Sequence, residues 1–363
     1  MIPKFQINTR LIALHLGLIA LGTLGGLGAQ WIGIPLPFIL GSMIVVAIFA
    51  QSSEALAKKT TRTLLPPDFK FNDDLRAVFI GIIGMAIGTR ITMDLILTLP
   101  KAAFSFAALT LFVPLTFWLN YQIFRRIGKY DHPTALFSGS PGGLYEAILF
   151  GEKAGADMRQ LMLAQFLRII LVVTLLPIGM SLYIGHPVGS SAGLGLAPAD
   201  TGLEHLPIGV VVVGFGLWIG HRIHLPAPQL IGPLLLAGIV TLSGLAVLDL
   251  PNWVLSISQI VIGTTLGTRF VGIRPSMLFT STWLALISVG SMLFVAMLMV
   301  LLLVPLTGEH FDVLLISFAP GGVTEMALIA LSLNANPAFV TLHHIYRIIL
   351  TVVVIGRAAK KFG

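Results

Sequence analysis

The chain has 363 residues, of which 56% are hydrophobic and only 10% are charged, with a net charge of +7. Soluble domains carry about 25% charged residues, so this composition excludes an ordinary soluble protein and indicates an integral membrane protein. The chain contains no cysteine, which excludes disulfides, haem thioether attachment and thiolate metal sites. Its basic residues are scattered in short loops, which favours membrane orientation over nucleic-acid binding.

Apolar runs that approach or exceed the roughly 20 residues needed to cross a hydrocarbon core recur along the chain. The first follows Lys4 and Arg10, as a signal peptide would, but it is 19 residues long without a clear small-residue cleavage site, so we interpret it as a retained span. The ten predicted spans are Leu11–Ala29, Pro35–Ala50, Leu75–Thr89, Ala102–Phe124, Leu161–Ile184, Leu206–Gly220, Pro226–Leu248, Val254–Thr268, Met277–Thr307 and Phe339–Ile355.

Two related motifs interrupt these runs, SPGGLYEAILFG at Ser140–Gly151 and APGGVTEMALIAL at Ala319–Leu331. Their shared residues are displaced by 179, and a Gly-Thr-Arg motif upstream recurs at the same displacement. The matching residues are Pro141, Gly142, Gly143, Glu146 and Arg168 with Pro320, Gly321, Gly322, Glu325 and Arg347, and Gly84, Gly88, Thr89 and Arg90 with Gly263, Gly267, Thr268 and Arg269. We therefore predict two copies of one unit, residues 1–184 and 204–363, joined by a flexible linker at 185–203.

The distribution of Lys and Arg predicts the topology, since those of short loops stay in the cytoplasm. If the amino terminus is inside and the segment around Pro141 enters and leaves on one side, 18 of the 22 Lys and Arg residues are cytoplasmic. If the segment around Pro141 instead crosses the membrane completely, the distribution of Lys and Arg agrees less well with this rule. We expect an all-α integral membrane protein with two inverted repeats, each of about five transmembrane helices plus one re-entrant or broken helix, and with both termini cytoplasmic.

Inverted repeats with discontinuous helices are the architecture of many secondary transporters, whose solutes bind where the breaks meet. Irregular backbone at membrane depth must be buried in protein or line a cavity, and a helix that starts there exposes N–H groups suited to an anion. The predicted solute-binding residues are Pro141, Gly142, Gly143, Glu146, Arg168, Pro320, Gly321, Gly322, Thr324, Glu325 and Arg347.

Ionisable residues within apolar sequence are functional candidates by default. We predict ion coupling at Glu146, Glu325, His343 and His344, of which His343 is four residues before Arg347 and so shares its helix face. A hydrogen-bonded packing role for the two histidines stays open. So does a fixed pairing of Glu146 with Arg168 and of Glu325 with Arg347, 22 residues apart in each copy, in place of solute contact.

Gly84 with Gly88, and Gly263 with Gly267, have the small-xxx-small spacing that lets membrane helices approach closely, so we predict a packing role for them.

The segments SGSPGGLYEAILFGEKAGADMRQLMLAQFLRI and APGGVTEMALIALSLNANPAFVTLHHIYRIIL, with the Gly-Thr-Arg pair, resemble the AbrB family of duplicated bacterial membrane proteins. Its members are often labelled ammonia monooxygenases or AbrB family regulators. The resemblance covers nearly the whole chain and implies a multi-pass protein of the bacterial inner membrane. More distantly, the chain looks like transporters built from two inverted five-helix units.

Three functions compete. The favoured one is a secondary transporter of a small polar solute, for which we expect an anion, coupled to H⁺ or Na⁺ by alternating access. A membrane enzyme with copper chemistry would need several converging imidazoles, whereas only the adjacent His343 and His344 are suitably placed, so an enzyme is less favoured. A non-transporting membrane sensor that affects gene regulation indirectly is the third. We predict no metal or other cofactor and no nucleic-acid partner; the partners are the lipid bilayer and a solute, and homo-oligomerisation stays open.

Overall fold

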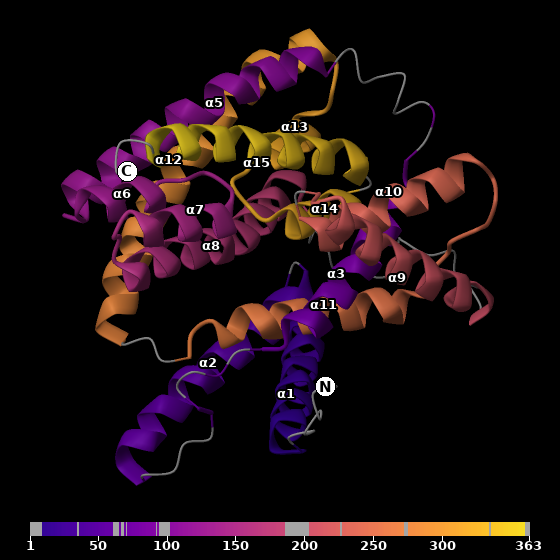
Figure 1. Ribbon diagram of the computed structural model, residues 1–363, viewed down its shortest axis with the longest axis horizontal. Coiled ribbons are helices and arrows are strands. Elements are labelled where there is room, and N and C mark those ends of the chain that lie inside the picture. The colour runs from indigo at the N-terminus through magenta and orange to yellow at the C-terminus, as the bar shows by residue number, and fades with distance from the viewer. Residues whose placement is uncertain are drawn as a thin grey trace.

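The computed structural model describes residues 9–34, 36–60, 65–66, 69, 71–91, 93, 102–185, 203–225, 227–271, 275–333 and 335–359. Within these ranges every regular element is a helix (Figure 1). The first half contains α1 Thr9–Ile32, α2 Pro37–Thr60, α3 Asp73–Gly88, α5 Ala103–Gln122 with a π-helical extension Ile123–Ile127, α6 His132–Ser138, α7 Leu144–Lys153 and α8 Met158–Ile184. The second contains a 3₁₀ turn Leu203–His205, α9 Leu206–Arg222, α10 Pro228–Leu242, α11 Asn252–Thr268, α12 Pro275–Thr307, α13 Phe311–Phe318, α14 Val323–Ser332 and α15 Pro337–Ala359. Most of the predicted linker lies outside the described residues.

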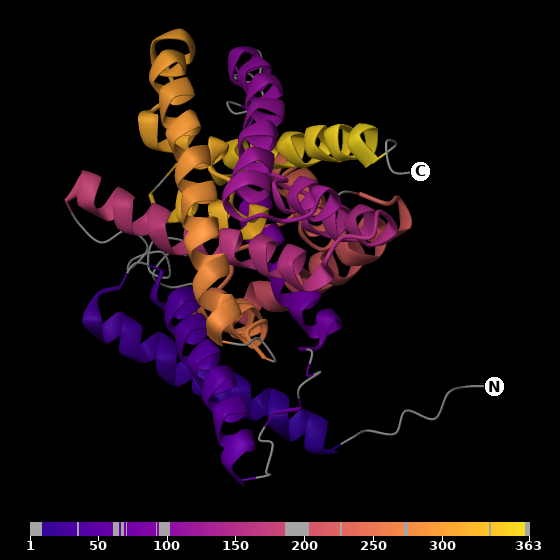
Figure 2. The same cartoon turned by 90° about the vertical axis from the view of Figure 1, so that its left-hand side faces the viewer.

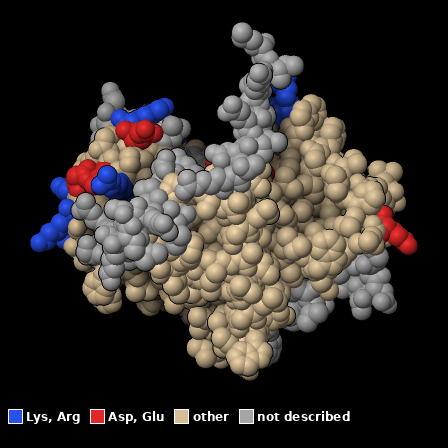
Figure 3. All heavy atoms as spheres, turned by 90° about the horizontal axis from the view of Figure 1, so that it is seen from below, with Lys and Arg blue, Asp and Glu red and all other residues tan. Residues whose placement is uncertain are grey.

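The predicted all-α membrane protein is confirmed. Six helices of the described chain are long and apolar enough to cross a bilayer: α1, α5 with its extension, α8, α9, α12 and α15. The other four predicted spans correspond to α2, which has 24 residues, and to the shorter helices α3, α10 and α11. Large apolar side chains such as Trp31, Leu182 and Phe279 are more than four-fifths exposed, and Figure 3 shows the described charges only at the margins of one face. Such a surface suits lipid rather than water.

Helix boundaries repeat along the chain as the duplication predicts. The helices α6, α7 and α8 begin at His132, Leu144 and Met158, and α13, α14 and α15 begin at Phe311, Val323 and Pro337, a constant displacement of 179. The irregular segments before α7 and α14 therefore fall at equivalent places in the two halves. Figures 1 and 2 place α1 and α2 at one end of the molecule and α5 and α15 toward the other, while the long helix α12 runs between the two ends.

The two halves interlock through glycines. Helix α3 packs against α10, and α11 packs against α2. A Cβ at Gly84 or Gly88 would overlap the carbonyl oxygen of Leu230 or Leu234 on α10. Gly263 and Gly267 meet the carbonyl oxygens of two α2 residues, Ile39 and Met43, in the same way. The packing role predicted for these glycines is confirmed, because only glycine permits such close backbone approach.

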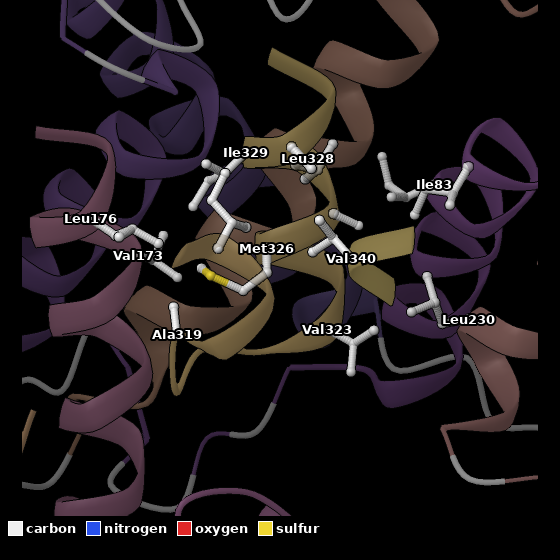
Figure 4. Packing of buried hydrophobic residues seen from close by; sticks show 14 of the residues in the cluster. Ile83, Val173, Leu176, Leu230, Ala319, Val323, Met326, Leu328, Ile329 and Val340 are labelled. Carbon is white, nitrogen blue, oxygen red and sulfur yellow. The ribbon is translucent and has the colours of Figure 1, made fainter. Parts of the chain in front are cut away.

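The second broken segment lies in the protein core. All residues of α14 from Val323 to Leu331 are buried. Figure 4 shows Met326, Leu328 and Ile329 of this helix among side chains of other elements, including Val173 and Leu176 of α8, Ile83 of α3, Leu230 of α10 and Val340 of α15. The irregular backbone before α14 is therefore surrounded by protein, as backbone at membrane depth must be.

Candidate functional site

The first break, Gly139–Gly143, joins two short helices that fold back on each other. Gly143 adopts a left-handed conformation (φ 61°), which reverses the chain before α7. The Asp157 N–H, just after α7, donates to Thr134 Oγ1 near the start of α6 at 2.7 Å, so the two ends of the hairpin meet. The Ser140 hydroxyl donates to the Gly142 carbonyl inside the break. The contacts are those of a helical hairpin with its turn at the break.

Side chains of α8 bind the free carbonyl groups at the turn. Arg168 donates through Nη1 to the Ser140 carbonyl. Gln165 Nε2 donates to the carbonyl oxygens of Phe137, at 2.9 Å, and Ser138, at 3.2 Å. The last carbonyls of a helix have no partners within it, and a cation or amide can satisfy them. Arg168 and Gln165 thus fix the end of α6.

The second break, Ala319–Gly322, is held in the same way from α15. Arg347 donates to three carbonyl oxygens, those of Phe318 at 3.4 Å, of Gly321 at 2.8 Å and of Ala319. Arg347 Nη2 also donates to His344 Nδ1 at 2.8 Å. The site of this arginine is fully buried, since its side chain is only 1% exposed.

The two histidines have different surroundings. His344 Nε2 donates to the Ile316 carbonyl at 2.9 Å, and its other ring nitrogen accepts from Arg347. His343 shares a hydrogen bond of 2.7 Å with Ser105, contacts the Phe339 carbonyl and stacks on the Phe106 ring. The histidine that binds Arg347 is His344, three residues before it, and not His343, four residues before it. A helical turn of 3.6 residues allows either spacing.

Within the described part of the chain, Glu325 and Arg347 do not pair with each other. Carbonyl oxygens and His344 take the described hydrogen bonds of Arg347, while the Glu325 carboxylate turns back toward Gly322, where a Cβ would overlap its Oε2. The pairing that the 22-residue spacing left open is therefore absent in the second copy. The side chain of Glu146 lies outside the described part of the chain.

Both breaks open onto one cavity of about 830 Å³. Of the predicted solute-binding residues, eight line it: Gly142, Gly143, Arg168, Gly321, Gly322, Thr324, Glu325 and Arg347. Pro141 and Pro320 are buried in the turns without lining the cavity, and His343 and His344 also lie outside its wall. The halves touch directly here, since a Cβ at Gly142 would lie 3.7 Å from Arg347 Nε.

The cavity also has polar lining that the sequence analysis did not assign to a site: Asp73, Asp74, Arg76, Arg269, His221, His224 and Gln229. The guanidinium of Arg269 lies over the Phe166 ring, 4.9 Å from its centroid. Arg269 directly follows α11, whose residues Val254, Leu255 and Ser258–Thr268 are buried.

Each of the two matching arginines at the cavity has one unused donor. The Nε atoms of Arg168 and Arg347 are buried and have no hydrogen-bond partner in the described structure. These side chains are 4% and 1% exposed, and both line the cavity. A buried donor without a partner costs about 1–3 kcal/mol, so each guanidinium retains one position for an acceptor.

Comparison with known proteins identifies one matching family and two relatives that cover nearly the whole chain. The family described as transition state regulatory protein AbrB matches residues 55–363. A Bacillus subtilis (strain 168) protein named YhjN and described as uncharacterized is 26% identical over 353 residues, covering 92% of this chain and 89% of the relative. An Escherichia coli (strain K12) protein whose name describes it as a regulator, AbrB, is 23% identical over 356 residues, covering 95% of each chain.

Proposed function

This chain belongs to the AbrB family, and from that premise we propose that it is a secondary transporter of a small polar, anionic solute, coupled to H⁺ or Na⁺ by alternating access. The observation that carries the proposal is the shared cavity, which is lined by glycines of both breaks and by the matching arginines Arg168 and Arg347. Two inverted copies with breaks at a common site are the arrangement that alternating access uses. We propose residues 1–184 and 204–363 as these copies.

The charges at the site support an anion. Arg168 and Arg347 bind only neutral carbonyl groups or His344 in the described structure, so their positive charges are not neutralised there. The start of α14 adds backbone N–H groups at the same wall. Cavities of roughly 300–1,000 Å³ suit small organic ligands. The apolar walls formed by Ile349, Val352 and Leu266 suit a ligand with a carbon skeleton.

The proposed coupling residues remain Glu146, Glu325, His343 and His344. The hydrogen bonds of the two histidines indicate which of them is better suited to carry a proton. His344 must donate to a carbonyl and accept from a guanidinium, so its ring is neutral. His343 Nδ1 donates to the Phe339 carbonyl, while Ser105 Oγ lies within reach of both His343 Nε2 and the Ala102 carbonyl. The Ser105 hydroxyl can donate to His343 Nε2 when the ring is neutral, and it can rotate to accept from Nε2 when the ring is protonated. This favours His343 over His344 as a proton carrier.

Reconstitution in liposomes tests the proposal. We expect an inward proton or sodium gradient to drive uptake of an organic anion, measured with radiolabelled carboxylates and by currents on a supported membrane. Arg168→Lys and Arg347→Lys should each lower uptake by about tenfold or more, because a lysine cannot replace the planar set of donors of a guanidinium that lines the cavity. Exposed Arg159→Lys, on the first turn of α8, is the matched control.

Gradient-independent binding without flux would favour a membrane sensor instead. Stoichiometric copper in the purified protein would favour an enzyme. Absence of flux for a broad panel of anions, with correctly folded protein in the liposomes, would contradict the proposal.

A further inference from the structure

The Glu325 carboxylate occupies an anion-favouring position at the cavity, the first turn of α14. It lies three residues into the segment after the second break and folds back so that Oε2 stands beside Gly322, at the amino end of α14. Helix α14 has ten residues, and no other side chain caps its start. An acidic group at this end is stabilised by the helix dipole and by unpaired N–H groups. The carboxylate thus sits where a bound anion would be stabilised.

The neighbouring donors identify the position as a ligand site rather than an ordinary helix cap. Arg168 and Arg347 line the same cavity, and each has a buried Nε without a partner. Neither guanidinium uses Glu325 as an acceptor; their described bonds go to carbonyls and to His344. Two guanidinium groups, each with an unpaired Nε, therefore line the same cavity as one carboxylate that satisfies neither of them.

From this arrangement we infer that Glu325 is an internal competitor for the solute: a small organic carboxylate binds between Arg168, Arg347 and the start of α14 by displacing the Glu325 carboxylate. The inference rests on the proposed anion-binding role of the cavity. It names the ligand class, because the group now held at the helix start is itself a carboxylate. It also gives the coupling, since a Glu325 that takes up a proton no longer competes with an anion.

The charges around Glu325 are consistent with exchange. Helix α15 presents Arg347, with His344 behind it, and α8 presents Arg168. Helix α3 presents Arg76, whose charge acts on Glu325, together with Asp73 and Asp74. Arg269, His221 and His224 complete the ionisable lining. With Glu325 ionised, Arg168 and Arg347 exceed the inner carboxylate by one positive charge; with Glu325 protonated they exceed it by two, and an anion is held more strongly.

The test measures binding of acetate and succinate to the detergent-purified full-length protein, by calorimetry and thermal shift, with chloride at equal ionic strength as reference. We expect Glu325→Gln to lower the Kd of one of these carboxylates by about tenfold at neutral pH, because the competing charge is gone. Acidification should strengthen binding more in the wild type than in Glu325→Gln, because only the wild type can lose the competing charge of Glu325.

Two further variants complete the design. Glu325→Ala empties the position and should bind at least as tightly as Glu325→Gln, which keeps the test decisive if one variant folds poorly; size-exclusion profiles monitor folding. Glu152→Gln removes an exposed carboxylate at the end of α7 and should leave the Kd unchanged. Unchanged or weaker binding in the Glu325 variants, or binding of neither carboxylate to any form, overturns the inference. Gradient-driven uptake in liposomes would still support the transporter in that case.

Discussion

The two breaks have the same plan and different chemistry. Gln165 donates to the Phe137 carbonyl in the first half, and His344 donates to the Ile316 carbonyl at the matching place in the second. Arg168 and Arg347 both bind the residue that precedes the proline, Ser140 or Ala319. Arg347, however, has three carbonyl partners and a histidine. The comparison teaches that the second break is the more tightly held, and that its carboxylate is free to serve another purpose.

The largest expected effect separates the two arginines. Arg347→Met should lower the free energy of unfolding by about 2–4 kcal/mol, because several buried acceptors lose their donor at about 1–3 kcal/mol each. Arg168→Met, which releases fewer described bonds, should cost about 1–2 kcal/mol. Thermal and detergent-induced unfolding of the purified variants measures the difference. If Arg168→Met loses as much stability as Arg347→Met or more, the second break is not the more tightly held.

A matched pair of glycine substitutions comes next. Gly143→Ala places a Cβ on left-handed backbone (φ 61°) and should lower stability by about 1–2 kcal/mol. Gly322 has ordinary extended angles (φ −74°, ψ 148°), so Gly322→Ala should cost less stability and instead push the Glu325 carboxylate away. Gly143→Ala should therefore change the free energy of unfolding more than carboxylate binding. Gly322→Ala should change carboxylate binding more than the free energy of unfolding. A stability loss that is larger at Gly322 would show that the carboxylate cannot move.

The smallest expected effect concerns His344. Because Gln165 makes the equivalent bond in the first half, His344→Gln should retain the contact to Ile316 and lose only about 0.5–1.5 kcal/mol. Its uptake should keep the wild-type response to a proton gradient, whereas His343→Gln should weaken that response. Liposome uptake at several proton gradients checks both. A variant His344→Gln that loses the response, beside a normal His343→Gln, would reverse the ranking of the two histidines.

Much of this site was readable in the sequence, for a physical reason. The 179-residue displacement located both breaks and both buried arginines, because each break needs glycines to turn and a cation to bind its exposed carbonyls. The partners of Arg347 were not predictable, since a sequence pattern shows side chains and not the free carbonyls at the end of a short helix. Arg76 and Arg269 were missed because their helices had to be packed before both charges faced the same cavity.

The central claim is that the first break meets the second half of the chain at the shared cavity, and a cross-link tests it most directly. A Cβ at Gly142 would lie 3.9 Å from Thr351 Cβ, which is a spacing that a disulfide requires. The chain has no cysteine, so the pair Gly142→Cys with Thr351→Cys can be introduced without background, together with a protease site between residues 185 and 203. The account predicts that the cleaved halves stay joined after mild oxidation and separate on reduction, whereas Gly17→Cys with Thr351→Cys stays unlinked. Halves of the folded Gly142–Thr351 pair that separate without reductant would contradict it.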